Sequence, residues 1–250
     1  MCASSSSDRA IKIEGHVDFL CPWSYLAERT VDAAIQTFQS KHPGWQFEVI
    51  WRPFILFPDL GTGISKREFY DKDVSQTPAA KARLRTAGSK YGVIFSWLGR
   101  TGSSRNAHTL SNLVLERLGS AAQARVVEQL FAGHFEHGRD ISSQQWLLEV
   151  GCQAGLPEEE VRAMLRSDAA ARATEWAARR AREQHGVEAV PCMTVQSRFR
   201  VGGYQDQDLF ETLFEKIKTE KEASAVEQAY SVSREMGGEE DGCRPQFTPG

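Results

Sequence analysis

One cysteine of this chain lies where a thiol could be activated. Cys21 is followed by Pro22, Trp23 and Ser24, and these residues separate an alternating apolar segment from one with helical spacing. Proline is accepted in the first turn of a helix, because its missing N–H would have no partner there. The same turn offers unpaired N–H groups and the positive end of the helix dipole, which stabilise a thiolate. We therefore expect Cys21 to be the reactive sulfur, with a lowered pKa.

The remaining cysteines are Cys2, Cys152, Cys192 and Cys243. No two cysteines form a Cys-x-x-Cys pair, and an odd number at wide spacing argues against a secreted disulfide framework. Cys2, Cys152 and Cys243 are interpreted as inert small apolar residues. A thiol packed under the helix is the alternative interpretation of Cys21. Cys192 should point into the core, away from Cys21, because neighbouring strand residues face opposite sides.

The segments around Cys21 predict a strand, a helix and a second strand. Residues 11–19 largely alternate apolar and polar side chains, and residues 45–51 do so again. Between them, apolar residues recur at helical spacing from Pro22 to the break at residues 42–44. This order favours a right-handed crossover and a parallel strand pair.

The rest of the chain predicts a helical insertion followed by two strands and a helix. Residues 63–184 are mostly helical in their periodicity. A short strand opens at Val190-Pro191, residues 198–201 form another, and residues 208–218 a last helix with a capping box at its start.

Together these elements predict an α/β protein with the thioredoxin fold, βαβ…ββα, and a long all-helical insertion between the halves. In that topology the strand after the insertion begins with a cis-proline beside the reactive cysteine, so Val190-Pro191 is expected to be cis. The predicted organisation is a thioredoxin-like domain from residues 10–62 and 185–220, a lid from 63–184, and flexible tails at 1–9 and 221–250.

Composition excludes several classes of protein. The 250 residues are 41% hydrophobic with a net charge of −3, and no basic run alternates with aromatic residues, so a nucleic-acid partner is not expected. No apolar run approaches the roughly 20 residues that span a membrane. No signal peptide precedes the first strand, which favours a cytoplasmic protein. His134 and His137 are three residues apart on a predicted helix, but Glu136 should point to a different face and no cysteine is near, so no metal is expected.

Several segments carry a family resemblance. They are residues 18–26, 51–58, 107–108, 138–141, 154–156, 186–191 and 202–205. In this order they resemble the DsbA-like family, specifically its FrnE-like branch, over roughly residues 11–218. Kappa-class glutathione transferases and hydroxychromene-carboxylate isomerases share that architecture.

Ser24 departs from the pattern of FrnE-like oxidoreductases, which usually have Cys-Pro-Trp-Cys. A second thiol attacks the mixed disulfide and releases the product, and a serine hydroxyl does not do this. Kappa-class enzymes and the isomerases typically have Ser-Pro-x-Ser, whose first serine steers the sulfur of glutathione. With Cys21 first and Ser24 last, this chain combines the two patterns.

Further candidate residues follow from the resemblance and from their positions. Trp23 is either a wall of the groove or plain helix packing. Arg52 ends the second strand, where ligands of parallel sheets bind, and a surface ion pair is its alternative. In the family, the segment around His108 faces the groove, although its neighbours differ here. Gln205 and Asp206 occupy the place where kappa-class enzymes contact glutathione, with a helix cap as the alternative for Asp206.

The resemblance implies glutathione as a cofactor and a small-molecule electrophile or thiol as the substrate. Pro22, Trp23, Arg52, His108, Val190, Pro191, Gln205 and Asp206 would bind them. The leading hypothesis is cis–trans isomerisation of a polyketide-like double bond in secondary metabolism, by reversible addition of a thiol. The alternatives are a glutathione-coupled thiol-disulfide oxidoreductase and a non-enzymatic binding module. A second copy of the chain is a candidate partner, as a homodimer.

Overall fold

The computed structural model describes residues 9–72 and 77–236 and contains a central four-stranded sheet. Across the sheet the strands are β2 (Gln46–Pro53), β1 (Ala10–Val17), β5 (Cys192–Val195) and β6 (Phe199–Gly202). The pair β1–β2 is parallel, whereas β1–β5 and β5–β6 are antiparallel. Helix α1 (Pro22–Lys41) connects β1 to β2, and α9 (Gln207–Met236) follows β6. The predicted thioredoxin topology is therefore confirmed.

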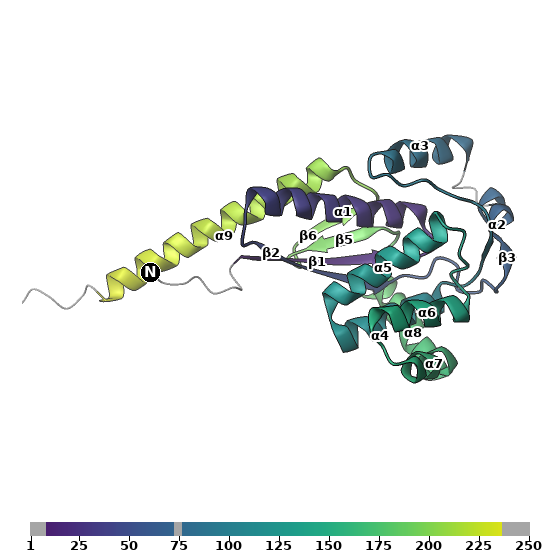
Figure 1. Cartoon of the computed structure of the whole chain (residues 1–250). Helices are drawn as coiled ribbons and strands as arrows, with labels where there is room; N and C mark the ends of the chain where they lie inside the picture. Colours follow the sequence, from purple (N-terminus) through teal and green to yellow (C-terminus); the bar gives the residue numbers. More distant parts are fainter. Residues whose placement is uncertain (1–8, 73–76, 237–250) are drawn as a thin grey trace, which may run out of the picture.

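The two faces of the sheet differ in character. Ile11 and Ile13 point into the core, where α1 and α9 lie along the sheet (Figure 1). The alternate residues Lys12, Glu14 and His16 point to the opposite face, because side chains of a strand alternate. One face is thus a hydrophobic core, and the other presents charged side chains.

The insertion contains helices from α2 to α8. They are α2 (Lys66–Lys72), α3 (Pro78–Ser89), α4 (Arg105–Leu118), α5 (Ser120–Phe135), α6 (Gln144–Ala154), α7 (Glu158–Arg166) and α8 (Asp168–Glu183). It also holds the two-residue strands β3 (Ile64–Ser65) and β4 (Arg100–Thr101), which pair antiparallel, so the predicted helical insertion is confirmed apart from this short ladder. Gln123 of α5 bonds both the N–H and the carbonyl of Trp51, at 2.9 and 2.8 Å, and so closes the edge of β2.

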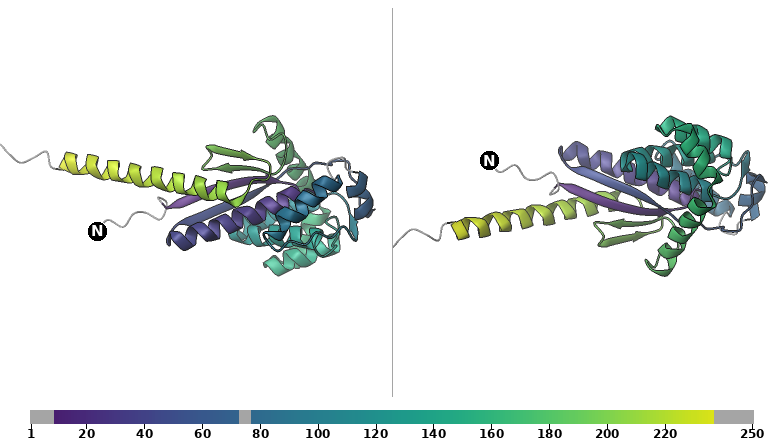
Figure 2. Two further views of the ribbon diagram at one scale, coloured as in Figure 1. Left: turned by 90° about the horizontal axis from the view of Figure 1, so that it is seen from above. Right: turned by 90° about the horizontal axis from the view of Figure 1, so that it is seen from below.

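Helix α9 is longer than the sequence analysis predicted. It continues to Met236 instead of ending near Lys218, so residues 221–236 belong to this helix. Residues 219–236 contain no glycine or proline and are rich in helix formers, and ion pairs such as Lys218–Glu222 (3.1 Å) support them. Figure 2 shows α9 running past the end of the sheet. Residues 1–8 and 237–250, expected to be tails, lie outside the described residues.

No helix of the described chain is long and apolar enough to cross a membrane.

Candidate active site

Cys21 lies between the end of β1 and the start of α1. Its backbone is extended (φ −94°, ψ 109°) and forms the N-cap, with Pro22 as the first helical residue. The Cys21 N–H donates to the Asp18 carbonyl at 2.9 Å, and the Cys21 carbonyl accepts from the Ser24 N–H at 3.0 Å. These bonds fix a tight turn that places the sulfur at the helix N-terminus, as the Cys-Pro sequence predicts.

The strand after the insertion brings a second element to the sulfur. The Val190-Pro191 peptide bond is cis, which confirms the prediction. Cys21 Sγ donates to the carbonyl oxygen of Val190 at 3.6 Å. Two segments 169 residues apart in sequence therefore meet at the thiol.

The protonation of Cys21 differs from the expectation. Its side chain is 7% exposed, and burial raises the pKa of the thiol to about 11. The neighbouring Ser24 acts in the opposite direction, through its side chain and its backbone, and the nearby Asp18 carboxylate adds to the increase. The prediction of a lowered pKa was wrong, because desolvation of the buried sulfur outweighs the helix N-terminus.

Ser24 is fully buried directly beside the sulfur. Its hydroxyl oxygen has no hydrogen-bond partner of good geometry among the described residues. A buried polar atom without a partner is unusual in folded proteins and calls for an explanation. The hydroxyl is therefore available to a thiolate or another acceptor that approaches Cys21.

The other described cysteines do not complete a dithiol. Cys192 is a free thiol whose Sγ accepts from Arg200 Nε at 3.3 Å, and it packs against Phe54 and Val187. It is a free thiol, as predicted, but it is buried in a small cluster separate from the main core. Cys152 is exposed, on the solvent side of the amphipathic helix α6.

Trp23 forms one wall beside the thiol. It is half-buried, and its ring centroid lies 5.4 Å from that of Tyr204. The guanidinium of Arg83 lies 5.6 Å from the Trp23 ring centroid and forms no ion pair or hydrogen bond with any described residue. Arg83 belongs to α3, which packs over α1 at the end where Cys21 lies (Figure 1). Arg83 of the lid therefore places a positive charge over Trp23 that no described carboxylate neutralises.

Asp206 and Gln205 lie next to this wall, but both are already engaged. Asp206 Oδ1 accepts from Lys90 Nζ at 2.7 Å, and this hydrogen bond lowers the pKa of the carboxyl. Gln205 Nε2 donates to the Gly202 carbonyl at 3.0 Å. The Lys90–Asp206 bridge joins the lid to the segment that precedes α9, so the Asp206 side chain acts as a tether between them rather than as a helix cap.

Arg52 and His108 have partners other than the thiol. Arg52 Nε pairs with Glu14 Oε2 at 3.1 Å on the charged face of the sheet, so the surface ion pair is the correct interpretation. His108 is 2% exposed, and its ring is tilted against that of Phe19 with the two centroids 4.6 Å apart. Its Nε2 lies 3.7 Å from Asp18 Oδ1, so this side of α4 packs into the core instead of facing a groove.

Asp18 was not predicted to belong to this site. Asp18 is fully buried, and its two carboxylate oxygens accept from the Leu20 N–H at 3.0 Å and the Leu56 N–H at 2.6 Å. It therefore holds the loop that leads into Cys21. The sequence did contain a signal for this role, because Asp18 places a carboxylate directly after the apolar residues of β1.

Lys66 of the lid was also missed. Its Nζ is buried and donates to the carbonyls of His134 and of Arg139, and burial lowers its pKa to about 8. Tyr70 donates to the Leu20 carbonyl at 2.9 Å and contacts His134 Nε2 at 3.1 Å. These bonds connect the lid to the residue before Cys21, and no local sequence pattern indicates them. Within the described residues, no cluster of metal-ligating side chains forms.

The sequence matches the family defined as the DSBA-like thioredoxin domain over residues 12–218. The chain belongs to the DsbA-like family. Members of this family are thiol-disulfide oxidoreductases and isomerases. No curated protein matches the sequence.

Solved structures share the fold of this DsbA-like protein. A probable DsbA oxidoreductase from Streptomyces coelicolor has 25% identity and a TM-score of 0.70, covering 84% of this chain and 91% of its own. A 2-hydroxychromene-2-carboxylate isomerase has 15% identity and a TM-score of 0.62, covering 85% and 98%. The cytosolic disulfide reductase DsbM from Pseudomonas aeruginosa, solved with GSH, has 17% identity and a TM-score of 0.57, covering 82% and 98%. The last two likenesses concern the fold alone.

Proposed function

We propose that this DsbA-like protein is a glutathione-linked enzyme of the FrnE-like branch that isomerises a double bond in a small, polyketide-like electrophile. The observation that carries the proposal is the chemistry around Cys21. The thiol is buried and neutral, it contacts the Val190 carbonyl, and a serine occupies the place of a resolving cysteine. A neutral S–H is a hydrogen-bond donor, which is the role that the first serine has in the Ser-Pro-x-Ser pattern.

The residues around the thiol fit glutathione. Ser24 offers a buried hydroxyl without a partner, which a thiolate would satisfy. Trp23 and Tyr204 provide an aromatic wall, and Arg83 provides a guanidinium that is not paired with any described carboxylate. Guanidinium groups bind carboxylates through paired N–H donors, and glutathione carries two carboxylates.

Bound there, glutathione would supply a sulfur that adds reversibly to a conjugated double bond, which becomes a single bond that can rotate before the sulfur leaves. Cys21 and Ser24 would donate hydrogen bonds to that sulfur and hold it in position. Arg83 would bind a carboxylate of the tripeptide, and the Lys90–Asp206 bridge would keep the lid closed over the groove. No net oxidation occurs, so a resolving thiol is unnecessary.

The second candidate is a monothiol disulfide oxidoreductase, in which external glutathione resolves a mixed disulfide on Cys21. The likeness to a protein described as a probable DsbA oxidoreductase favours it. A third candidate, a binding module without catalysis, would use the same groove. We further propose that the protein acts in the cytoplasm, where glutathione is abundant.

Two measurements on the purified protein separate these candidates. Intact mass is recorded after incubation with oxidised glutathione, with Cys152→Ser as background because Cys152 is exposed. Thermal unfolding is recorded with and without reduced glutathione. A higher melting temperature without an adduct on Cys21 supports the isomerase, an adduct on Cys21 supports the oxidoreductase, and neither effect supports the binding module.

Variants test the role of the protein sulfur. Cys21→Ser recreates the Ser-Pro-x-Ser pattern and should keep glutathione binding and part of the glutathione-dependent activity. Arg83→Gln should weaken glutathione binding by about tenfold, since a hydrogen bond to a charged group contributes about 1.5–3 kcal/mol. The control is Arg85→Gln, an exposed arginine of the same helix. Complete loss of binding in Cys21→Ser, or equal effects in the two arginine variants, would contradict this arrangement.

A further inference from the structure

A cavity of about 570 Å³ lies on the charged face of the sheet, lined by residues that the thiol site does not use. The side chains that can carry charge in it are Lys12, Glu14, His16, Glu48, His185, Arg198 and Arg200. They come from β1, β2, the β5–β6 hairpin and the segment after α8, so four separate parts of the chain build the cavity.

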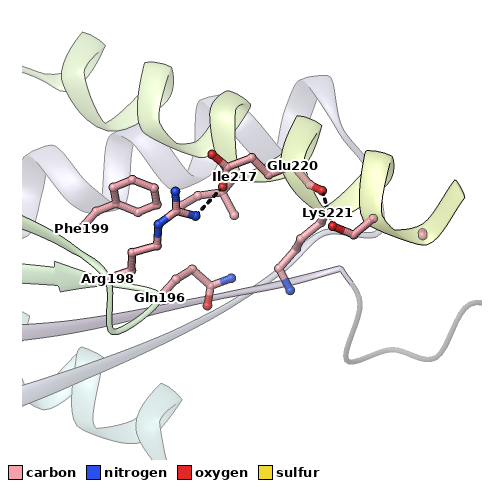
Figure 3. Close-up of a pocket in the computed structure, with 8 residues that line it drawn as sticks. Gln196, Arg198, Phe199, Ile217, Glu220 and Lys221 are labelled. Atoms are coloured by element: carbon pink, nitrogen blue, oxygen red, sulfur yellow. Dashed lines mark hydrogen bonds and ion pairs between the residues drawn. The ribbon is translucent and has the colours of Figure 1, made fainter. Parts of the chain in front are cut away.

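Most of these charges are already neutralised. Lys12 Nζ pairs with Glu48 at 3.0 Å, and Glu14 pairs with Arg52 at 3.1 Å. Figure 3 shows Arg198 turned toward α9, where its Nη1 pairs with Glu220 at 2.7 Å. Both carboxylates of the cavity therefore have a cation of their own.

Arg200 is the exception. The only hydrogen bond of its side chain in the described chain runs from Nε to Cys192 Sγ at 3.3 Å, and no described carboxylate pairs with it. Its Nη1 lies 3.5 Å from where a Cβ on Gly186 would be, so the guanidinium reaches across the cavity toward the segment that carries His185. The cavity thus has an uncompensated positive charge beside an imidazole.

His16 adds a buried donor to the same cavity. It is 6% exposed, and its Nδ1 has no hydrogen-bond partner among the described residues. Burial lowers the pKa of His16, Glu14 raises it, and the neighbouring His185, Arg52 and Arg200 lower it further. An unpaired polar atom of this kind is expected to meet a ligand or water.

We propose that this cavity binds the oxyanion group, phosphate or carboxylate, of a small molecule. Arg200 supplies paired N–H donors for two oxygens of the anion, and His16 and His185 supply imidazole donors. The anion neutralises the charge of Arg200 and satisfies the unpaired Nδ1 of His16. His16 pairs in register with Cys192, which directly follows Pro191, so the cavity adjoins the strand that the cis-proline opens. The proposal does not depend on the isomerase assignment.

Binding can be measured on the full chain with two probes at constant ionic strength. Isothermal titration with inorganic phosphate and with succinate distinguishes the two kinds of oxyanion, and sodium chloride serves as the reference. The Cε1–Hε1 signals of the histidines are followed by NMR in parallel, with His185→Gln used for assignment. We expect saturable binding of at least one probe, together with saturable shifts of His16 and His185.

Arg200→Gln should weaken that binding about tenfold or more, because one charged hydrogen-bond partner is lost. The control is Arg172→Gln, an exposed arginine of α8 that does not line the cavity, which should retain wild-type affinity. Saturation by phosphate alone or by succinate alone supports the proposal and identifies the group bound. Absence of saturable binding with both probes, or equal weakening in the two variants, would overturn it.

Discussion

At pH 8 the thiol of Cys21 should react with iodoacetamide far more slowly than the exposed thiol of Cys152. The thiolate is the reactive form of cysteine. Burial raises the pKa of Cys21 to about 11, so about one molecule in a thousand carries the thiolate at pH 8. A free cysteine in solution, with the ordinary pKa of about 8.5, is ionised in roughly a quarter of molecules and serves as the reference thiol. The ratio predicts that Cys21 reacts about two hundredfold more slowly than this reference.

The assay is alkylation with limiting reagent at several pH values from 7 to 10, followed by peptide mapping of all five cysteines. Between these values the rate at Cys21 should rise about tenfold for each pH unit, because its thiolate fraction does so below the pKa. The pH dependence shows whether Cys21 reacts slowly because its thiol is protonated or because the reagent does not reach it. A thiol that is merely shielded, with a low pKa, would react slowly at a rate independent of pH. Cys152→Ser confirms the assignment of the fast site.

Labelling of Cys21 ahead of Cys152 at pH 7, or a rate at Cys21 that levels off below pH 9, would refute the reasoning. Either result would mean that the helix N-terminus and Ser24 outweigh desolvation. Cys21 would then be a thiolate, unable to donate a hydrogen bond to the sulfur of glutathione. The monothiol oxidoreductase would become the better assignment.

Three further outcomes are expected. Ser24→Cys should gain disulfide-exchange activity in an insulin turbidity assay and lose isomerase activity under oxidising conditions, with dithiothreitol restoring the latter; a wild type already as active as this variant with insulin would argue against the role given to Ser24. Burial raises the pKa of Glu28 to about 8, so the free energy of unfolding of the wild type should fall as pH rises from about 4.3 to 8, by at most about 5 kcal/mol. Urea unfolding should show that Glu28→Gln lacks this loss. The exposed control Glu188→Gln should keep it. Tyr70→Phe leaves the Leu20 carbonyl without its donor and should lower the free energy of unfolding by about 1–3 kcal/mol; an unchanged value would mean that water replaces the hydroxyl.

Local sequence determined the framework of the site. Alternation and helical spacing predicted β1, α1 and β2, and the Cys21-Pro22 pair predicted the start of the helix. The proline that opens the strand after the insertion predicted the cis bond beside the thiol. These features depend on residues that are neighbours in the chain, so the sequence displays them directly. The length of α9 could also have been predicted from the sequence, because residues 219–236 contain no glycine or proline.

Tertiary structure decided the electrostatics. The pKa of Cys21 depends on how completely Val190, Pro191 and the lid exclude water from the sulfur, and these segments are far from it in sequence. By residue type, His108 and Arg52 are both suited to bind a ligand. In the folded protein His108 packs against Phe19 and Asp18, and Arg52 pairs with Glu14.

Arg83 carried no signal on its exposed helix, and only the fold of the lid brings it over Trp23. The sequence thus determined which chemical groups the site contains. Which of them are buried, paired or charged followed from contacts between distant segments, because desolvation and Coulomb interactions depend on distance in space and not on separation along the chain.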